Sequence, residues 1–328
     1  MEKLDPAFNN RFGLHYFDDT LHYTNRDLVD WLPILSSLNV TTLILKSDAT
    51  RAIPEQFIST LMGAGITPII HIPLSLPDSP APADLKAILE AYARWGVHQV
   101  ILFNKPNAAA SWSTSAWAQQ GIVERFLDKF IPLANLVLHT GMIPIFPPLE
   151  PGGSYWDLVF LKSALQSLVR RKQNALLDKM ALAVYGFTGD HPLNWGEGGQ
   201  TRWAGNLPYF TPADSQDQRG FRIFEWYQTI SQSILQKNIP VYLLGAGIKQ
   251  DQPGGSYADE AHLCLVKEIL ASLKQMDATA SNFIPEYVIS CSFYRLAAAS
   301  GSADEEFAWY YTKDQPRLTA ATLIQEAE

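Results

Sequence analysis

Residues 97–107 read VHQVILFNKPN, an apolar run that ends in polar residues, and residues 121–141 read GIVERFLDKFIPLANLVLHTG. The first pattern predicts a buried β-strand, because its apolar side chains are continuous rather than alternating. The second pattern has the longer apolar spacing that is typical of a helix. Together they predict one strand-then-helix unit.

The same unit recurs along the chain. Strands are predicted over 11–17, 40–47, 66–73, 97–107, 142–149, 180–187, 239–247 and 285–297, and a helical pattern follows each of them. Eight such units predict an α/β fold, a (β/α)8 TIM barrel that residues 1–328 form as a single domain. An open doubly wound sheet is the alternative, and it is disfavoured because no Gly-x-Gly-x-x-Gly follows the first strand.

One connection is much longer than the others. The segment between Phe187 and Gly220 has little periodicity and exceeds ordinary loop lengths. Its aromatic residues are Trp195, Trp203, Tyr209 and Phe210. A long loop after the sixth strand predicts a lid or a wall of a binding cleft, and a surface insertion without a role is the alternative.

Composition excludes several classes of partner. The chain has 25 Lys and Arg against 33 Asp and Glu, a net charge of −8, which argues against nucleic acid and anionic membranes as partners. No signal peptide or membrane span is evident, so a cytoplasmic protein is expected. Cys264 and Cys291 are predicted to be buried thiols. The seven histidines are scattered, so neither a metal site nor a cofactor is predicted, and the oligomeric state is left open.

Two strand ends carry a family resemblance. The stretch FNKPNAAASW at 103–112 is similar to an Asn-Glu-Pro-Asn motif followed by a tryptophan, and IPVYLLGAG at 239–247 is similar to Pro-Val-x-x-x-Glu-x-Gly. On these motifs the chain resembles the clan A glycoside hydrolases, in particular their xylosidase-like and cellulase-like members. The resemblance implies one catalytic carboxylate on the fourth strand and another on the seventh. The matching residues here are Lys105 and Gly245, which supply neither an acid nor a nucleophile for this chemistry.

The resemblance also implies a site for a carbohydrate or a sugar-like small molecule. Asn104 matches an asparagine that binds a sugar hydroxyl, and aromatic rings near strand ends can stack on a sugar. The expected binding residues are Asn104, Asn107, Trp112, Tyr185, Trp195, Glu197 and Tyr294. For each aromatic residue, a place in the core or the rim of the barrel is the alternative.

These observations favour a catalytically degenerate, carbohydrate-binding barrel, in which Lys105 forms an ion pair with Glu150 or Asp251 or attracts an acidic ligand. Two alternatives are a non-enzymatic interaction protein and a Schiff-base chemistry at Lys105. A third is an active glycosidase with relocated loop carboxylates. Its candidate acids are Asp18, Asp19, Glu150, Asp190 and Glu197.

Overall fold

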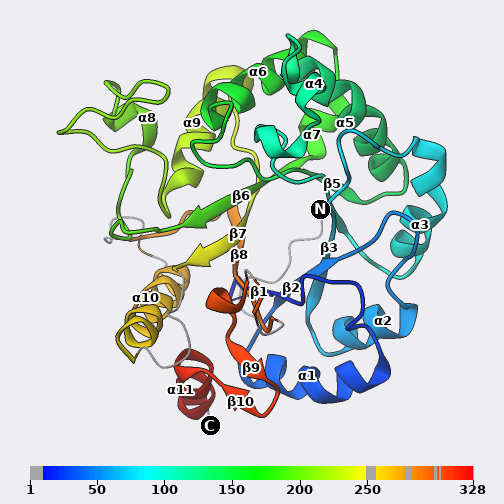
Figure 1. The fold of residues 1–328 in the computed structure, drawn as a ribbon, viewed down its shortest axis with the longest axis vertical. Helices are drawn as coiled ribbons and strands as arrows, with labels where there is room; N and C mark the ends of the chain where they lie inside the picture. The colour runs from blue at the N-terminus through cyan, green and yellow to red at the C-terminus, as the bar shows by residue number, and fades with distance from the viewer. Residues whose placement is uncertain are drawn as a thin grey trace.

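The computed structural model describes residues 10–248, 256–275, 277, 282–298, 301–302 and 304–327. Eight parallel strands pair in chain order, and the eighth pairs with the first, so the predicted closed barrel is confirmed (Figure 1). The strands are β1 (Phe12–His15), β2 (Thr42–Lys46), β3 (Thr67–Ile72), β4 (Gln99–Leu102), β5 (Ile143–Phe146), β6 (Ala181–Phe187), β7 (Val241–Gly247) and β8 (Val288–Phe293).

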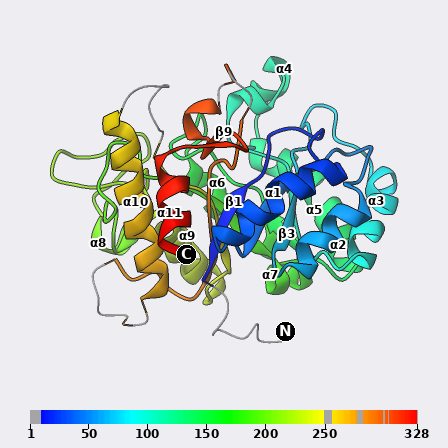
Figure 2. The same cartoon turned by 90° about the horizontal axis from the view of Figure 1, so that it is seen from below.

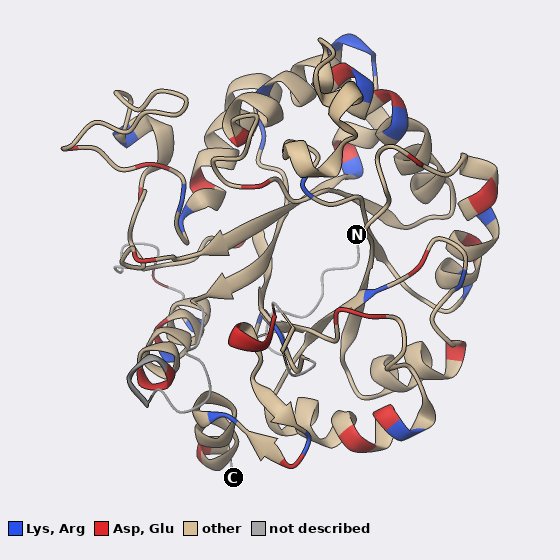
Figure 3. Ribbon diagram, in the orientation of Figure 1, with Lys and Arg blue, Asp and Glu red and all other residues tan. Residues whose placement is uncertain are grey.

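Helices surround the barrel (Figures 1 and 2), and most Lys, Arg, Asp and Glu residues lie on these helices and on the loops (Figure 3). The longer ones are α1 (Asn25–Ser37), α2 (Glu55–Gly63), α3 (Pro82–Arg94), α5 (Ile122–His139), α6 (Asp157–Arg170), α9 (Ile223–Leu235), α10 (Ser256–Lys274) and α11 (Leu318–Ala327). The shorter elements are η1 (Ala109–Ser111), α4 (Thr114–Trp117), α7 (Asn174–Lys179), α8 (Gly199–Arg202), η2 (Glu305–Phe307), β9 (Tyr310–Thr312) and β10 (Gln315–Pro316). None of the helices in the described part of the chain is long and apolar enough to span a membrane.

Two apolar cores explain why the strands are apolar throughout. One core lies inside the barrel and contains Ile44, Ile69, Ile101 and Ile145, each from a different strand. Neighbouring strand residues such as Leu43 belong to a second, larger core against the helices. Because successive side chains of a strand point to opposite faces, both faces of this sheet are covered and both must be apolar.

The structure differs from the sequence prediction in one helix and in the exposure of one cysteine. The helical pattern after the fifth strand predicts one helix from about Tyr155 to Asp178, but the structure has two helices, α6 and α7. They are separated by a turn in which Lys172 has a left-handed φ of 55°. Cys291 is buried as predicted, but Cys264 is exposed, because it lies on the outward face of α10.

The long loop after β6 lies at the periphery of the barrel. In both views it extends outward beside α9 rather than over the barrel axis (Figures 1 and 2). The indole of Trp226 donates to Gly196 O (2.9 Å), and Gly198 N donates to Glu225 (2.6 Å), so α9 holds the loop. Tyr209 anchors its far side, because its hydroxyl accepts a hydrogen bond from Trp156 N (2.7 Å) at the start of α6. The loop therefore forms part of the outer wall.

Candidate functional site at the barrel mouth

The carboxyl ends of the strands bring polar residues together at one end of the barrel, here called the mouth. His15 and Lys46 end β1 and β2, His71 lies in β3, Lys105 follows β4 and Glu150 follows β5. This is the end at which (β/α)8 barrels carry their active sites. The β6 to β8 side of the mouth is instead lined by aromatic rings.

Lys105 and Glu150 form an ion pair at the mouth. Glu150 was one of two partners expected for this lysine, and that expectation is confirmed; the other, Asp251, lies outside the described residues. Lys105 has a left-handed φ of 48°, and its backbone N–H donates to Pro148 O (2.9 Å), which ties the β4 and β5 loops together. Its ammonium lies 5.2 Å from the ring centroid of Tyr185. The lysine thus balances an acid and is partly exposed, which does not favour the desolvated neutral amine of a Schiff-base mechanism.

Asn104 lies beside this ion pair and contacts Tyr185. The Tyr185 hydroxyl donates to Asn104 Oδ1 at 3.0 Å. Burial, with help from Tyr294, raises the pKa of Tyr185 well above its usual value, so the hydroxyl remains a donor. The amide nitrogen of Asn104 has no hydrogen-bond partner among the described residues. This nitrogen can therefore donate a hydrogen bond to a hydroxyl group of a bound ligand.

An aromatic cluster of Tyr185, Phe187, Tyr294 and Phe307 fills the other side of the mouth. Phe187 stacks on Tyr185 (centroids 5.8 Å apart) and meets Tyr294 edge to face (5.7 Å). Phe307, from η2, lies 5.4 Å from Phe187 and 5.3 Å from Tyr294. The segment after β8 therefore packs over this part of the mouth, a place that the sequence interpretation had given to the β6 loop.

Gly245 in β7 lies against the same cluster. A Cβ at this position would come within 2.8 and 2.9 Å of two ring carbons of Phe187 and closer still to a third. The residue also has a left-handed φ of 71°, a backbone conformation that residues other than glycine rarely adopt. No larger residue fits here unless Phe187 moves.

A buried arginine neutralises two acids near β1 and β8. Arg295 contacts Asp18 (3.2 Å) and Asp304 (2.8 Å), and its guanidinium lies 4.3 Å from the ring centroid of Tyr294. Lys46 also contacts Asp18 at 3.3 Å. Burial raises the pKa of Asp304, and Arg295 opposes that shift. Asp18 and Asp304 are thus both engaged with cations.

Two buried histidines of the mouth are held neutral. Burial lowers the pKa of His71 to about 4, even though its Nε2 contacts Phe103 O at 2.9 Å. Burial, Arg295 and His71 lower the pKa of His15 well below its ordinary value. His15 Nε2 is buried without a hydrogen-bond partner in the described chain. Such orphaned groups are uncommon and indicate a place that a ligand hydroxyl or water can satisfy.

Two residues expected to bind sugar are instead used by the protein itself. Asn107 is fully buried; its amide donates to Glu150 O and Tyr155 O (both 2.9 Å) and accepts from Glu150 N (2.7 Å). Trp112 is also buried, and its indole donates to Pro106 O (2.8 Å). These residues shape the β4 and β5 loops that carry Lys105 and Glu150.

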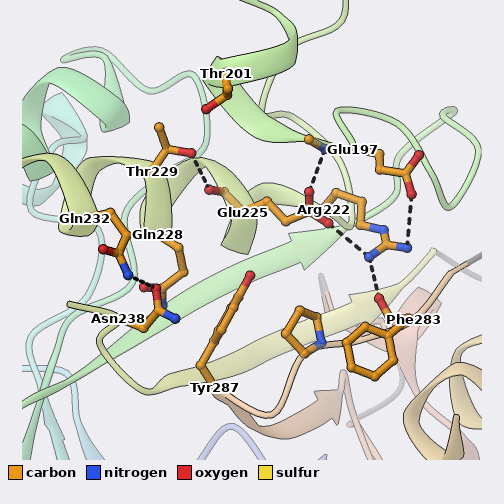
Figure 4. A pocket seen from close by; sticks show the side chains of 12 residues that line it. Glu197, Thr201, Arg222, Glu225, Gln228, Thr229, Gln232, Asn238, Phe283 and Tyr287 are labelled. Carbon is orange, nitrogen blue, oxygen red and sulfur yellow. Dashed lines mark hydrogen bonds and ion pairs between the residues drawn. The ribbon is translucent and has the colours of Figure 1, made fainter. Parts of the chain in front are cut away.

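The two expected residues of the long loop lie away from the mouth. Trp195 stacks on His191 (centroids 4.0 Å apart) and donates to Asp217 (3.1 Å). Glu197 pairs with Arg202 (3.1 Å) and lines a cavity on the outer wall (Figure 4). Since the loop runs along α9, neither side chain belongs to the mouth.

The other proposed acids also separate. Asp18 and Glu150 lie at the mouth, Asp19 pairs with His22 (2.9 Å), and Asp190 belongs to the peripheral loop. Sequence reasoning missed Arg295 and Phe187, although both stand at strand ends and the same rule would have found them. Within the described ranges, no group of three His, Cys, Asp or Glu is arranged to hold a metal ion.

Comparisons by sequence identify no relative: no family model and no curated protein matches the chain. Comparisons by structure find many solved proteins. A family 39 glycoside hydrolase from Bacteroides cellulosilyticus WH2 aligns with 97% of this chain at a TM-score of 0.61 and 12% identity, and the chain spans 63% of that protein.

Two other glycoside hydrolases match along nearly their whole length. A GH128 endo-β-1,3-glucanase from Sorangium cellulosum aligns with 96% of this chain and 97% of its own (TM-score 0.53, 14% identity). Xylanase 10B from Thermotoga petrophila RKU-1, solved with xylobiose, aligns with 98% of this chain and 94% of its own (TM-score 0.56, 8% identity). At these identities the likeness is one of fold alone: the chain has a (β/α)8 barrel similar to those of these proteins.

Proposed function

We propose that this chain is a non-hydrolytic carbohydrate-binding protein built on a glycoside hydrolase-like barrel, with the sugar bound at the mouth. The proposal depends on Lys105 and Gly245. Glycoside hydrolysis needs two carboxyl groups on either side of the bond, about 5 Å apart for retention and about 6.5–9.5 Å for inversion. At the fourth-strand position stands Lys105, ion-paired with Glu150, and at the seventh stands Gly245, with the ring of Phe187 in the space of a side chain.

Free polar groups next to aromatic rings support a bound sugar at the same place. The Asn104 amide nitrogen and His15 Nε2 lack partners among the described residues, and Tyr294 lies 4.7 Å from the His15 ring. A sugar offers hydroxyls to such groups and its C–H face to such rings. The structural neighbours support this ligand class as well, since one of them is a xylanase in complex with xylobiose.

Hydrolysis by relocated carboxylates is the less favoured function. A general acid must hold a proton at the working pH. Glu150 contacts Lys105, and Asp18 and Asp304 contact Arg295, so each of these carboxylates is already engaged in an ion pair. To act as a general acid, one of these carboxylates would first have to break its ion pair.

Titration calorimetry against xylobiose, cellobiose, laminaribiose and glucuronic acid, with product analysis of each sample, tests the proposal. We expect at least one sugar to bind and to be recovered intact. Asn104→Ala should weaken binding about tenfold, the loss of one or two hydrogen bonds. Asn135→Ala, which removes a half-buried amide of α5 that donates to Gln173 (3.1 Å), should leave binding unchanged.

Two results would contradict the proposal. Cleavage products that disappear in Glu150→Gln or Asp18→Asn would show that the acids have been relocated. The absence of binding to every sugar would leave the barrel as an interaction platform.

A further inference from the structure

A cavity of about 560 Å³ lies on the outer wall of the barrel, between α9 and the segment that precedes β8 (Figure 4). This volume falls within the ~300–1,000 Å³ that is usual for small-molecule sites. Tyr287 lines the cavity immediately before β8, whereas Tyr294 follows β8 at the mouth. A strand rises ~3.3 Å per residue, so the two tyrosines lie roughly 20 Å apart. The outer-wall cavity is therefore separate from the mouth.

Tyr287 gives the cavity an aromatic surface. Its half-buried ring stands between Gln228 and Phe283 in Figure 4. The hydroxyl has no hydrogen-bond partner among the described residues, and burial raises the pKa of Tyr287, so the group is an available donor. A ring face beside a free hydroxyl fits a ligand that has both an apolar face and polar edges.

The charges that line the cavity balance one another. Arg222 is almost fully buried and donates to Glu225 (3.0 Å) and to Phe283 O (2.7 Å), while its other terminal nitrogen lies 3.8 Å from Glu197. Glu197 also pairs with Arg202 (3.1 Å). Two acids thus face two arginines, so among the described residues that line the cavity no cation is left unpaired to select an anionic ligand.

Neutral polar groups complete the rim. Gln232 donates to the Asn238 side chain (2.7 Å), and the two amides together retain free donors and acceptors. Thr201 adds an exposed hydroxyl. The Nε of Arg222 is buried without a partner in the described part of the chain, so a ligand or water can satisfy it. An apolar ligand would leave these groups unsatisfied, at a cost in free energy.

We infer that the outer-wall cavity is a second binding site, for a neutral carbohydrate unit whose C–H face lies on Tyr287 and whose hydroxyls bind Gln232, Asn238 and Thr201. This site goes beyond the one proposed at the mouth and does not depend on it. A chain that holds a sugar at two separate places binds a polysaccharide more tightly than either site alone.

Saturation-transfer NMR and calorimetry test the inference, with xylobiose, cellobiose and laminaribiose as neutral probes and glucose 6-phosphate as a charged comparator. The Asn104→Ala protein, in which the mouth is impaired, should still bind a neutral probe. Adding Tyr287→Ala should weaken that binding at least tenfold, whereas Tyr287→Phe, which keeps the ring, should change it less than threefold. Gln232→Ala is a surface change and should weaken binding severalfold even if Tyr287→Ala fails to fold.

The outcomes separate the two sites. Binding that Asn104→Ala abolishes but Tyr287→Ala leaves intact would place the sugar at the mouth alone and overturn the inference. Binding that only the Tyr287 and Gln232 changes affect would support the outer-wall cavity and contradict the mouth. A preference for glucose 6-phosphate, or no binding of any neutral probe to the Asn104→Ala protein, would also overturn it.

Discussion

The ring of Phe187 occupies the space that a side chain on Gly245 would need. Two of its carbons lie 2.8 and 2.9 Å from the ideal Cβ position, and the ring is held there by Tyr185, Tyr294 and Phe307. The glycine is thus matched by an aromatic cluster drawn from three segments of the chain. A residue with a carboxylate side chain fits at this position only if the Phe187 ring moves away from its neighbours in the cluster.

Gly245→Ala should lower the free energy of unfolding by about 2–5 kcal/mol, because a left-handed backbone costs ~1–2 kcal/mol and overpacking a further ~1–3 kcal/mol. When Phe187→Ala is the reference protein, the same glycine change should cost only the backbone part, because the ring that it would overlap is gone. Denaturant unfolding measures both. Gly63→Ala is the control, because its Cβ meets nothing within 4 Å and its helix should be unchanged or slightly stabilised. Equal effects at the two glycines would disprove the packing argument.

The double change Lys105→Glu with Gly245→Glu should not create hydrolysis of aryl glycosides. Both positions have left-handed backbones, and the second has no room for a carboxylate while Phe187 is present. The measurement is release of the aryl alcohol by protein that circular dichroism shows to be folded. Hydrolysis by this variant would mean that the Phe187 ring moves aside at little cost in free energy and that the mouth can place two carboxylates for glycoside hydrolysis.

The Lys105–Glu150 ion pair should contribute little to stability. Both side chains are more than one third exposed, and such pairs are worth ~0–1 kcal/mol. A double-mutant cycle with Lys105→Met and Glu150→Gln should give a coupling free energy in that range, falling as salt is added. The exposed Lys237–Asp178 pair (2.8 Å) is the matched comparison. A much larger coupling free energy would contradict this expectation and would mean that the ion pair is a major source of stability for the β4 and β5 loops.

Asp157 should make the protein less stable as the pH rises. The carboxyl is buried at the start of α6 and accepts from Gly152 N (3.0 Å), Gln218 (2.7 Å) and the Tyr227 hydroxyl (3.3 Å). Burial raises its pKa to about 6, above the ordinary value near 4. The protonated form is therefore favoured in the folded state, so this stabilisation is complete below about pH 4 and is lost as the pH rises through about 6.

Asp157→Asn imitates the protonated acid, so it should remove this pH dependence. The expected difference from wild type is roughly 3 kcal/mol between pH 4 and pH 7, measured by denaturant unfolding. Asp178→Asn, on the exposed side of α7, is the control and should follow wild type. Parallel pH curves for wild type and Asp157→Asn would rule out this assignment.

His262 should make the contact between α10 and α11 sensitive to acid. It is buried, and its Nδ1 lies 2.6 Å from the Thr319 hydroxyl of α11. Burial, and secondly Arg317, lower the pKa of His262 to about 3. Because the folded pKa lies below the unfolded value near 6.5, the stabilisation is complete above about pH 6.5 and is lost as the pH falls toward 3.

Hydrogen exchange of the α11 amides should therefore accelerate as the pH is lowered, after correction for intrinsic exchange. His262→Gln keeps a polar group without an ionisable ring, so it should reduce this effect. His139→Gln, at the end of α5, serves as the control. If α11 in wild type keeps its protection down to pH 4, the histidine does not govern this contact.

Most of the fold could be predicted because its signals are local. Each strand, such as 66–73, is one continuous apolar run, and the covering helices have their own spacing. The structure places β3 at Thr67–Ile72, within one residue of the predicted limits. The break between α6 and α7, and the short β9–β10 hairpin, escaped prediction because neither has a strong periodic pattern.

The candidate site was predictable only in part. The rule that polar residues gather at strand ends placed Asn104, Lys105 and Tyr185 together, and the expected contact of Lys105 with Glu150 is confirmed. The same rule gave no orientation for Glu197, which faces the outer wall. The direction of a loop side chain depends on the surface against which the loop packs. That surface is formed by residues distant in the sequence, so local patterns do not predict it.

The sequence by itself predicted the barrel, because eight apolar strands that alternate with helices indicate a parallel sheet buried on both faces, and no Gly-x-Gly-x-x-Gly follows the first strand to favour an open doubly wound sheet. It also carries the two short motifs on which Lys105 and Gly245 are expected to match the acids of the resembled family. Only the tertiary structure decided that Glu150 neutralises Lys105 and that Phe187 fills the space beside Gly245. Those contacts join residues from different strands and loops, and their distances are set by how the closed barrel brings the strand ends together.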